Sequence, residues 1–317
     1  FSRLQCSPAS IGSLPLSTTS VTRPSAATRA RLLPYLALAA GVLCISFTAI
    51  FTKWAAMPGP VAAAWRMTVA TVVLAIPFAR EARRWTPRER AGVKWGVMGG
   101  LWFAINLGML NSALLLTSAA NATLLDNTAP IWVGLGALLL FKERLGLRYW
   151  IGLALALAGA AVVTGFNPSA GFHLQSGDAL AFVGALFYAG YLLNTQRARR
   201  NLSSLSYVWL VGVAAAIALF AVSFALGLPL TGYPLQSYLS ILAVGVLSQA
   251  GGWLLISYAL GYLPASAAVI VLLAQPVVTG LLAVPLLGEA LTLRQGIGGA
   301  LALTGIYLCL RGNGGTA

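Results

Sequence analysis

The sequence predicts an all-α integral membrane protein with ten transmembrane helices, arranged as two inverted repeats of five helices each. The first reason is the composition, because 59% of the residues are hydrophobic and only 8% are charged, against roughly 25% charged residues in soluble domains. The second reason is a series of apolar segments long enough to cross a bilayer. The third is an internal repeat that relates the two halves of the chain.

The apolar segments begin after residue 31, and each has the length of about 18–25 residues that is needed to cross a ~30 Å hydrocarbon core. Polar and Gly/Pro-containing hinges separate them. We place the ten spans at 34–53, 60–79, 94–116, 119–141, 147–165, 178–196, 204–226, 236–260, 264–287 and 293–310.

The organisation of the chain follows from these spans. The first five-helix repeat is predicted at 32–166 and the second at 167–311, followed by a C-terminal tail at 312–317. Residues 1–31 are rich in Ser, Thr, Pro and Arg and contain no acid, so we expect a disordered basic tail. An organellar transit peptide has the same composition, and the first residue is not Met, which leaves a mis-started reading frame open.

The basic residues predict the orientation in the membrane. Most of the 20 Lys and Arg residues lie in the tail, in the 80–94 loop, after the fourth and sixth spans, and at the C-terminal end. Only Lys53, Arg66 and Arg294 fall elsewhere, with Arg66 inside a predicted span. Both termini are therefore expected in the cytoplasm, at a bacterial inner (plasma) membrane or alternatively an organellar membrane. The charge of +14 reflects this topology and does not indicate a nucleic-acid partner.

The repeat is a pattern of mid-helix proline, terminal glutamate and a glycine-rich helix. Pro130 and Pro276 are separated by the same interval as Glu143 and Glu289, with no gap between them. Because five crossings are an odd number, the second repeat must enter the membrane in the inverted orientation. Such inverted repeats build alternating access around a midplane site in many secondary transporters.

These residues carry a resemblance to a known family. The doubled pattern with its glutamates in KERL and GEAL, and the opening GVLCISFTAIFTK followed by AAAWRM, resemble the EamA family of the drug/metabolite transporter superfamily. The resemblance covers Leu32 to Arg311. It implies a central cavity and transport of small metabolites such as amino acids, often as export. The second repeat departs from the pattern, because it has SSLSYVWL where the first has Arg66.

The two prolines predict weak points near the bilayer midplane. Pro130 has no N–H, so the carbonyl of Asp126 loses its helical partner, and Pro276 has the same effect on Leu272. Freed carbonyls at this depth can bind a cation or a polar ligand. A simple kink in a packed helix is the alternative. The carboxylate of Asp126 favours a functional role in the fourth span, because acids inside membranes are costly.

Arg66 and Asp126 are predicted at matching depths of ~9–11 Å from the outer ends of their helices. Three interpretations remain open from the sequence. Arg66 can extend outward as an interfacial anchor, the two residues can form a structural ion pair, or they can face the cavity. In the cavity Asp126 would carry a proton or cation, and Arg66 would bind a substrate carboxylate with two hydrogen bonds.

Other polar and aromatic side chains within the spans complete a predicted amphipathic cavity. Each of them can instead serve helix–helix packing. The predicted substrate-binding set is Arg66, Trp102, Asn106, Asp126, Asn127, Tyr188, Tyr191, Gln249, Trp253 and Gln275, with Asp126 as the coupling residue and Pro130 and Pro276 as helix kinks.

Two features that occur in both copies of the repeat are expected to be structural. Glu143 and Glu289 lie at helix ends, where a carboxylate interacts favourably with the next helix N-terminus, so we expect a structural or gating role. The small-residue pairs Gly152/Ala156 and Gly298/Ala302 allow close helix approach. They can pack within one chain or support a homodimer.

The sequence argues against an enzyme. It has a single His, in a predicted loop, no paired acids within a span, and three scattered cysteines, so neither nucleophilic nor metal chemistry is indicated. We therefore expect a secondary transporter that exports a small molecule through the lipid bilayer by alternating access, without a metal or cofactor. A channel or lipid flippase is the nearest alternative.

Overall fold

The computed structural model describes residues 26–165, 175–288 and 290–313, and every regular element in these ranges is a helix. The first repeat contains α1 (Ala26–Ala55), α2 (Gly59–Ala82), α3 (Pro87–Leu116), α4 (Ala119–Asp126), α5 (Ala129–Leu140) and α6 (Leu147–Val163). The second contains α7 (Ser176–Ala198), α8 (Ser204–Ala225), α9 (Leu235–Ala243), the π-helix η2 (Val244–Gly252), α10 (Trp253–Leu260), α11 (Ala265–Leu272), α12 (Gln275–Leu287) and α13 (Leu293–Asn313).

These elements form ten spans, because α4–α5, α9–η2–α10 and α11–α12 each continue one crossing. Within the described ranges, nine spans have at least 18 residues and the apolar character needed to cross a membrane, and α6, with 17 residues, is the shorter tenth. The prediction of an all-α protein with two five-helix repeats is confirmed.

The first helix begins earlier than predicted. Helix α1 starts at Ala26, so residues 26–31 of the predicted tail are helical. The sequence AATRAR there consists mostly of good helix formers, which extend the apolar helix outward. Residues 1–25 of that tail lie outside the described residues. At the other end α13 continues to Asn313.

Side-chain caps define several of the helix starts. Thr86 precedes α3 and forms a capping box with Glu89, in which the Glu89 N–H bonds to the Thr86 hydroxyl at 3.4 Å. Ser118 and Ser203 accept hydrogen bonds from the backbone at the starts of α4 and α8, at 3.1 and 3.0 Å. These groups satisfy N–H donors that lack a partner within the helix.

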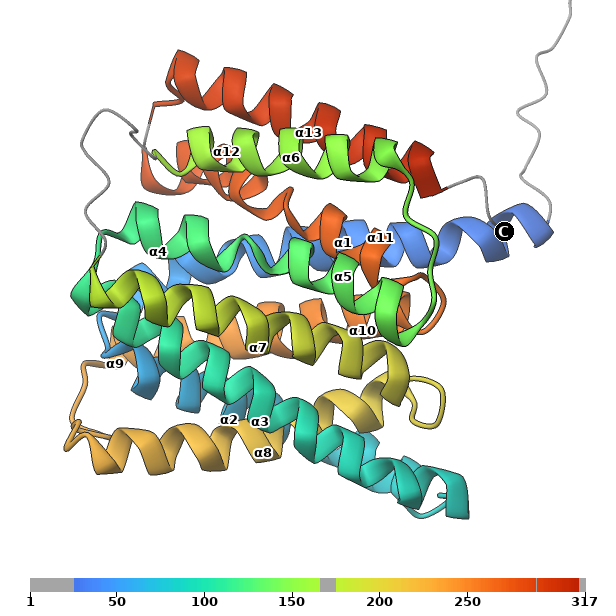
Figure 1. The fold of residues 1–317 in the computed structure, drawn as a ribbon. Helices are drawn as coiled ribbons and strands as arrows, with labels where there is room; N and C mark the ends of the chain where they lie inside the picture. The colour runs from blue at the N-terminus through green and yellow to red at the C-terminus, as the bar shows by residue number, and fades with distance from the viewer. Residues whose placement is uncertain (1–25, 166–174, 289, 314–317) are drawn as a thin grey trace, which may run out of the picture.

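The helix packing follows the pseudo-twofold symmetry expected of inverted repeats. Helix α2 packs on its counterpart α8, and α6 on its counterpart α13. The remaining contacts between repeats come in related sets: α1 packs on η2, α10 and α12, whereas α7 packs on α3, α4 and α5. Figure 1 shows the elongated bundle, with α13 and α6 side by side at its top. The first helix of each repeat therefore packs mainly on helices of the other repeat.

The closest approach in the bundle is between α6 and α13. A Cβ added at Gly159 would lie 2.3 Å from the Ala302 backbone N, and one added at Gly305 would lie 2.3 Å from the Ala156 backbone N. The two contacts are related by the repeat. The small residues that the sequence singled out thus face each other within one chain.

Both proline-containing spans are interrupted at the same repeat position. Helix α4 ends at Asp126 and α5 begins at Ala129, while α11 ends at Leu272 and α12 begins at Gln275. The Thr128 hydroxyl donates to the Leu125 carbonyl at 2.6 Å across the first interruption. Each break lies directly before its proline, as expected from the missing N–H.

The bundle has two chemically different ends. The end where α1 begins and α13 finishes, at the right of Figure 1, also carries the connections after α2, α5, α7 and α10. Arg and Lys side chains concentrate in the connections after α2, α5 and α7, and we call this the basic end. We call the other, where α1 meets α2 and α3 meets α4, the opposite end.

Replacing Gly159 by Ala is expected to destabilise the protein by about 1–3 kcal/mol, because the new methyl group overlaps backbone atoms of α13 that cannot move aside. Gly296→Ala in α13 is the matched control, since a Cβ there has no neighbour within 4 Å. Thermal unfolding in detergent measures both variants. Equal melting temperatures for the two would contradict the close helix contact.

Candidate functional site

A central cavity lies between the two repeats and opens at the opposite end of the bundle. Its wide outer part has a volume of about 560 Å³ and reaches residues at helix ends there, including Gly59, Thr164 and Leu287. A narrower inner recess of about 140 Å³ continues toward the basic end. The two parts share wall residues and therefore form one site: Thr48, Arg66, Leu107, Leu110, Asp126, Asn127 and Gln275.

Arg66 and Asp126 both line this cavity, and both parts of it. Among the described residues no ion pair joins them, and Arg66 Nε is buried without a hydrogen-bond partner. Of the three interpretations open from the sequence, the structure therefore places both charges on the cavity wall. The site carries opposite charges that face a shared space without neutralising each other.

The Asp126 carboxylate is held in place by the third and seventh helices. Asn106 on α3 donates from Nδ2 to Asp126 Oδ1 at 2.9 Å and to the Gly184 carbonyl of α7 at 3.1 Å. Asn106 is buried, with 3% of its surface exposed. Its amide thus connects α3, α4 and α7 at the point where α4 ends. A change in the charge of Asp126 would act directly on this contact between the repeats.

Helix α12 supplies a second polar group at its break. Gln275 lines the cavity, and its Nε2 donates to the Ile45 carbonyl of α1 at 3.4 Å. The Thr279 hydroxyl, one turn further along α12, donates to the Ser46 carbonyl at 3.0 Å. The start of α12 is therefore hydrogen-bonded to α1, the helix of the first repeat that packs on the second repeat.

Gln249 and Trp253 reach the inner recess from an unusual backbone segment. Gln249 lies in η2, and Trp253 follows it as the first residue of α10. The Ser248 hydroxyl donates to the Cys44 carbonyl at 2.7 Å, which fixes η2 against α1. π-Helical segments are rare and frequently occur at functional sites.

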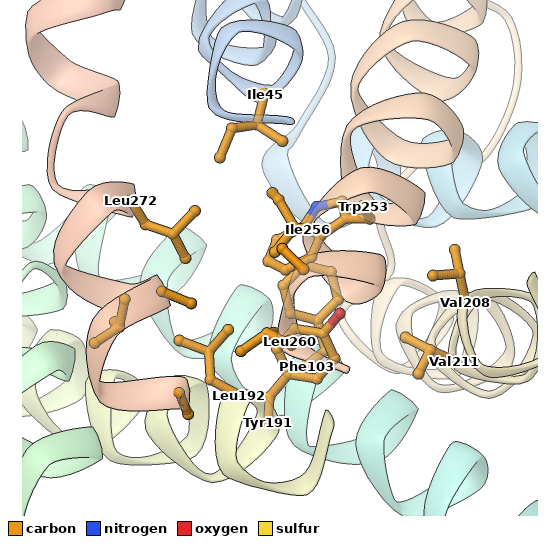
Figure 2. Packing of buried hydrophobic residues seen from close by; sticks show 14 of the residues in the cluster. Ile45, Phe103, Tyr191, Leu192, Val208, Val211, Trp253, Ile256, Leu260 and Leu272 are labelled. Atoms are coloured by element: carbon orange, nitrogen blue, oxygen red, sulfur yellow. The ribbon is translucent and has the colours of Figure 1, made fainter. Parts of the chain in front are cut away.

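A cluster of aromatic rings closes the recess toward the basic end. Phe103 stacks on Tyr191 at 4.6 Å between ring centroids and meets the edge of Trp253 at 5.1 Å. Tyr188 lies 6.4 Å from Trp253 on the cavity side. Figure 2 shows Phe103, Tyr191 and Trp253 packed together, with Ile256 and Leu260 further along α10. The cavity is therefore sealed at this end by a packed core.

Eight of the ten predicted substrate-binding residues line the cavity, and two do not. Tyr191 is buried beneath it, at 1% exposure, between Phe103, Trp253 and Tyr207. Trp102 lies against Gly190 on the outer side of α7, with its ring 5.4 Å from Phe187. Both positions depend on the orientation of α3 and α7 about their axes. Assigning residues to spans from the sequence does not specify this orientation. Of the predicted kink residues, Pro130 lines the inner recess and Pro276 the outer part.

Several residues of the site were absent from the predicted set. They come from α1, α3, α4 and α12. A hydroxyl or amide in an otherwise apolar span was the signal that could have identified most of them. These residues are Thr48, Thr52, Phe103, Asn111, Thr123 and Thr279.

Glu143 takes part in a contact between the repeats at the basic end. Glu143 lies in the loop that follows α5. Its Oε2 accepts a hydrogen bond from the hydroxyl of Ser266, which lies in the first turn of α11. The carboxylate thus lies near the start of a helix of the other repeat, where its charge is favourable. Its counterpart Glu289 lies outside the described residues.

The geometry defines a class of protein: a membrane protein of two inverted five-helix repeats with a charged, half-open cavity between them. The EamA-like transporter family matches residues 32–165 and 175–311, which together cover most of the chain. The chain belongs to this family.

Several solved structures have a similar fold, and one of them covers most of this chain. It is described only as "Crystal structure of protein" and shares 23% sequence identity, with a TM-score of 0.71, over 87% of this chain and 95% of the other. At this identity the likeness concerns the fold alone. No curated protein has a sequence significantly similar to this chain.

A cysteine at Thr52 is expected to react with a charged, membrane-impermeant thiol reagent, because Thr52 lines the outer part of the cavity. A cysteine at Thr195 is the matched control, since Thr195 is 1% exposed below the aromatic seal. Both are introduced after the three native cysteines are replaced by Ser or Ala. Mass spectrometry of reconstituted protein gives the labelled fractions. Faster labelling of Thr195→Cys would show that the cavity opens at the basic end instead.

Proposed function

We propose that the protein is a secondary transporter that moves a small polar or amphipathic metabolite across the membrane by alternating access. The proposal rests on one observation: Arg66 and Asp126 both line the same cavity, and no ion pair joins them among the described residues. Opposite charges at this depth are costly unless a ligand, an ion or water compensates them. A substrate that neutralises both would bind there more favourably than in an apolar pocket.

The shape of the cavity favours a carrier over a channel. The site is open at one end and closed at the other by the packed rings of Phe103, Tyr191 and Trp253. Passage therefore requires the inner half of the bundle to separate while the outer half closes. The inverted repeats supply a symmetry-related second conformation for this exchange.

The charges suggest a zwitterion, such as an amino acid, as the substrate class. The Arg66 guanidinium can bind a carboxylate through two parallel hydrogen bonds. Asp126 and Gln275 provide acceptors for an ammonium group, and Asn127 Nδ2, buried without a partner among the described residues, provides a further donor. Tyr188 and Trp253 present rings to the rest of the ligand. Predicted binding roles follow for Arg66, Asp126, Asn127, Tyr188 and Trp253.

Asp126 is also the group that can couple transport to a proton or cation. Its hydrogen bond from Asn106 links its charge to the contact of α4 with α3 and α7. Protonation weakens a hydrogen bond that is assisted by the carboxylate charge. The state of Asp126 would therefore bias the contact between repeats that must change when the cavity closes.

The positive-inside rule assigns the basic end to the cytoplasm, with both termini there. In this orientation the cavity faces away from the cytoplasm, as in the substrate-releasing state of an exporter. We propose export from the cytoplasm of a bacterial cell, across its inner membrane.

Asp126→Asn is expected to lower transport of labelled amino acids in proteoliposomes by about tenfold or more, the change produced by ~1.4 kcal/mol. The amide keeps the shape of the side chain but can neither ionise nor carry a proton. The residual transport should also lose its pH dependence. Glu89→Gln, on the exposed capping box of α3, is the control and should behave as wild type. An unchanged rate and pH profile in Asp126→Asn would exclude the coupling role.

Arg66→Gln is expected to raise the KM for amino acids about 10–100-fold, because charge-assisted hydrogen bonds contribute ~1.5–3 kcal/mol. Arg66→Lys should recover part of the loss, since it restores the charge without the bidentate geometry. The corresponding amines, which lack the carboxylate, should show no difference between Arg66→Gln and wild type. Non-saturable flux in the wild-type protein would instead indicate a channel.

A further inference from the structure

A second concave site lies on the outer surface of the bundle, away from the transport cavity. It is a groove of about 750 Å³ between α3, α5 and α7. Helix α7 contacts both α3 and α5 and forms the floor, while the other two helices form the walls. Figure 1 shows α5, α7 and α3 following one another across the face of the bundle.

The groove is apolar along most of its length. Leu135 and Leu139 of α5 and Leu186 of α7 line it and are exposed, Leu139 to 80%. Met98 and Trp102 form the opposite wall. Leucines exposed within membrane-spanning helices contact lipid chains, and a concave apolar surface gives such a chain more contact than a convex one does.

A glycine determines the depth of the groove. The Trp102 ring lies so close to Gly190 that a Cβ there would be 1.8 Å from a ring carbon. The indole is thus set against the α7 backbone and leaves the space beside it open. The groove is a feature of the packed fold and does not depend on a side chain that can swing into it.

Cations surround the basic end of the groove. The Arg197 guanidinium lies over the Trp95 ring, 4.9 Å from its centroid, and the Lys94 ammonium lies 5.6 Å from the same centroid. The Arg200 guanidinium lies 5.4 Å from the centroid of Phe141. Stacking holds these groups in position, and an arginine in this arrangement retains the N–H geometry that binds phosphate bidentately.

The carboxylates at the basic end interact with other groups. Glu81 accepts hydrogen bonds from the hydroxyls of Ser203 and Ser206. Glu89 accepts from Thr86, and Glu143 from Ser266. Among the described residues no ion pair joins these carboxylates to Arg197 or Lys94, so an anion from outside the chain can bind the two cations.

Asn194, a residue of the same groove, carries a polar acceptor without a partner among the described residues. Asn194 lines the groove and is 6% exposed, and its Nδ2 donates to the Trp95 carbonyl at 2.8 Å and to Tyr207 Oη at 3.2 Å. These bonds fix the orientation of the amide. Asn194 Oδ1 is then a buried acceptor with no hydrogen-bond donor among the described residues. Such a group is costly unless a donor reaches it.

We propose that the groove binds one anionic phospholipid. An acyl chain lies along the α7 floor against Leu186 and Leu139, and the phosphate binds Arg197 and Lys94. The two cations favour a lipid of net negative charge, such as phosphatidylglycerol, over zwitterionic phosphatidylcholine. Basic pockets between transmembrane helices on the cytoplasmic side bind anionic headgroups in this manner. The site needs no transport activity and is independent of the function proposed above.

The test is native mass spectrometry of purified protein supplied with equal amounts of phosphatidylglycerol and phosphatidylcholine. The wild-type protein should retain phosphatidylglycerol at least about tenfold better, a difference of ~1.4 kcal/mol. Arg197→Gln should abolish the preference. Arg84→Gln removes a charge from an exposed position of the α2–α3 connection, away from the groove, and should leave the preference unchanged.

A second pair of variants tests the apolar part of the site. Met98→Trp should fill the groove and reduce retention of phosphatidylglycerol severalfold. Val97→Trp, at the neighbouring position on a different surface, should have no effect. Melting temperatures measured without added lipid confirm that the variants fold.

Four results would overturn the proposal. Equal losses in Arg197→Gln and Arg84→Gln would show diffuse attraction to the basic end. Equal retention of the two lipids by the wild type would show an apolar surface without headgroup recognition. Unchanged retention in Met98→Trp would place the lipid elsewhere, as would a dimer joined through this groove.

Discussion

A carboxylate and a guanidinium inside the membrane-spanning region are energetically costly, and most of the site is arranged around this cost. Arg66 and Asp126 both face the central cavity, and no ion pair joins them within the described chain. Asn106 offsets part of the cost for Asp126 with a hydrogen bond that also reaches the Gly184 carbonyl. The compensation therefore connects the charged site to the packing of one repeat on the other.

That connection explains why the interrupted helices are central to the fold. Proline removes an N–H from the fourth and ninth spans, and both spans break directly before it, at Asp126 and at Leu272. In the first repeat the break places an acid at a helix end, whereas in the second it places Gln275 against α1. The same backbone device thus presents different side chains to the two sides of the cavity. The repeats are symmetric in construction and asymmetric in chemistry.

The inner half of the bundle has a contrasting composition. Phe103, Tyr191 and Trp253 close the cavity with ring contacts of 4.6–5.2 Å. Beyond them, hydrogen bonds such as those from Ser266 to Glu143 and from Ser203 to Glu81 join the repeats. Apolar packing is non-directional and can re-form in another arrangement at modest cost. The closely packed α6–α13 pair has no such freedom, because its backbones are in contact. We therefore expect α6 and α13 to remain together while the inner helices rearrange.

The sequence by itself determined the class of fold and the type of residue at the site. Length and hydrophobicity specify the spans, because a helix that crosses a bilayer must be continuously apolar. Charged residues and prolines within such spans are exceptions to this pattern and can therefore be recognised as candidate site residues. Eight of the ten predicted residues, Asp126 and Arg66 among them, line the cavity for this reason. Only the tertiary structure decided that Tyr191 lies in the seal, that Trp102 lies on the outer surface, and that Thr48 of α1 belongs to the site. Their positions depend on the rotation and packing of helices distant in sequence, and a one-dimensional pattern of apolar residues does not encode which face meets which neighbour.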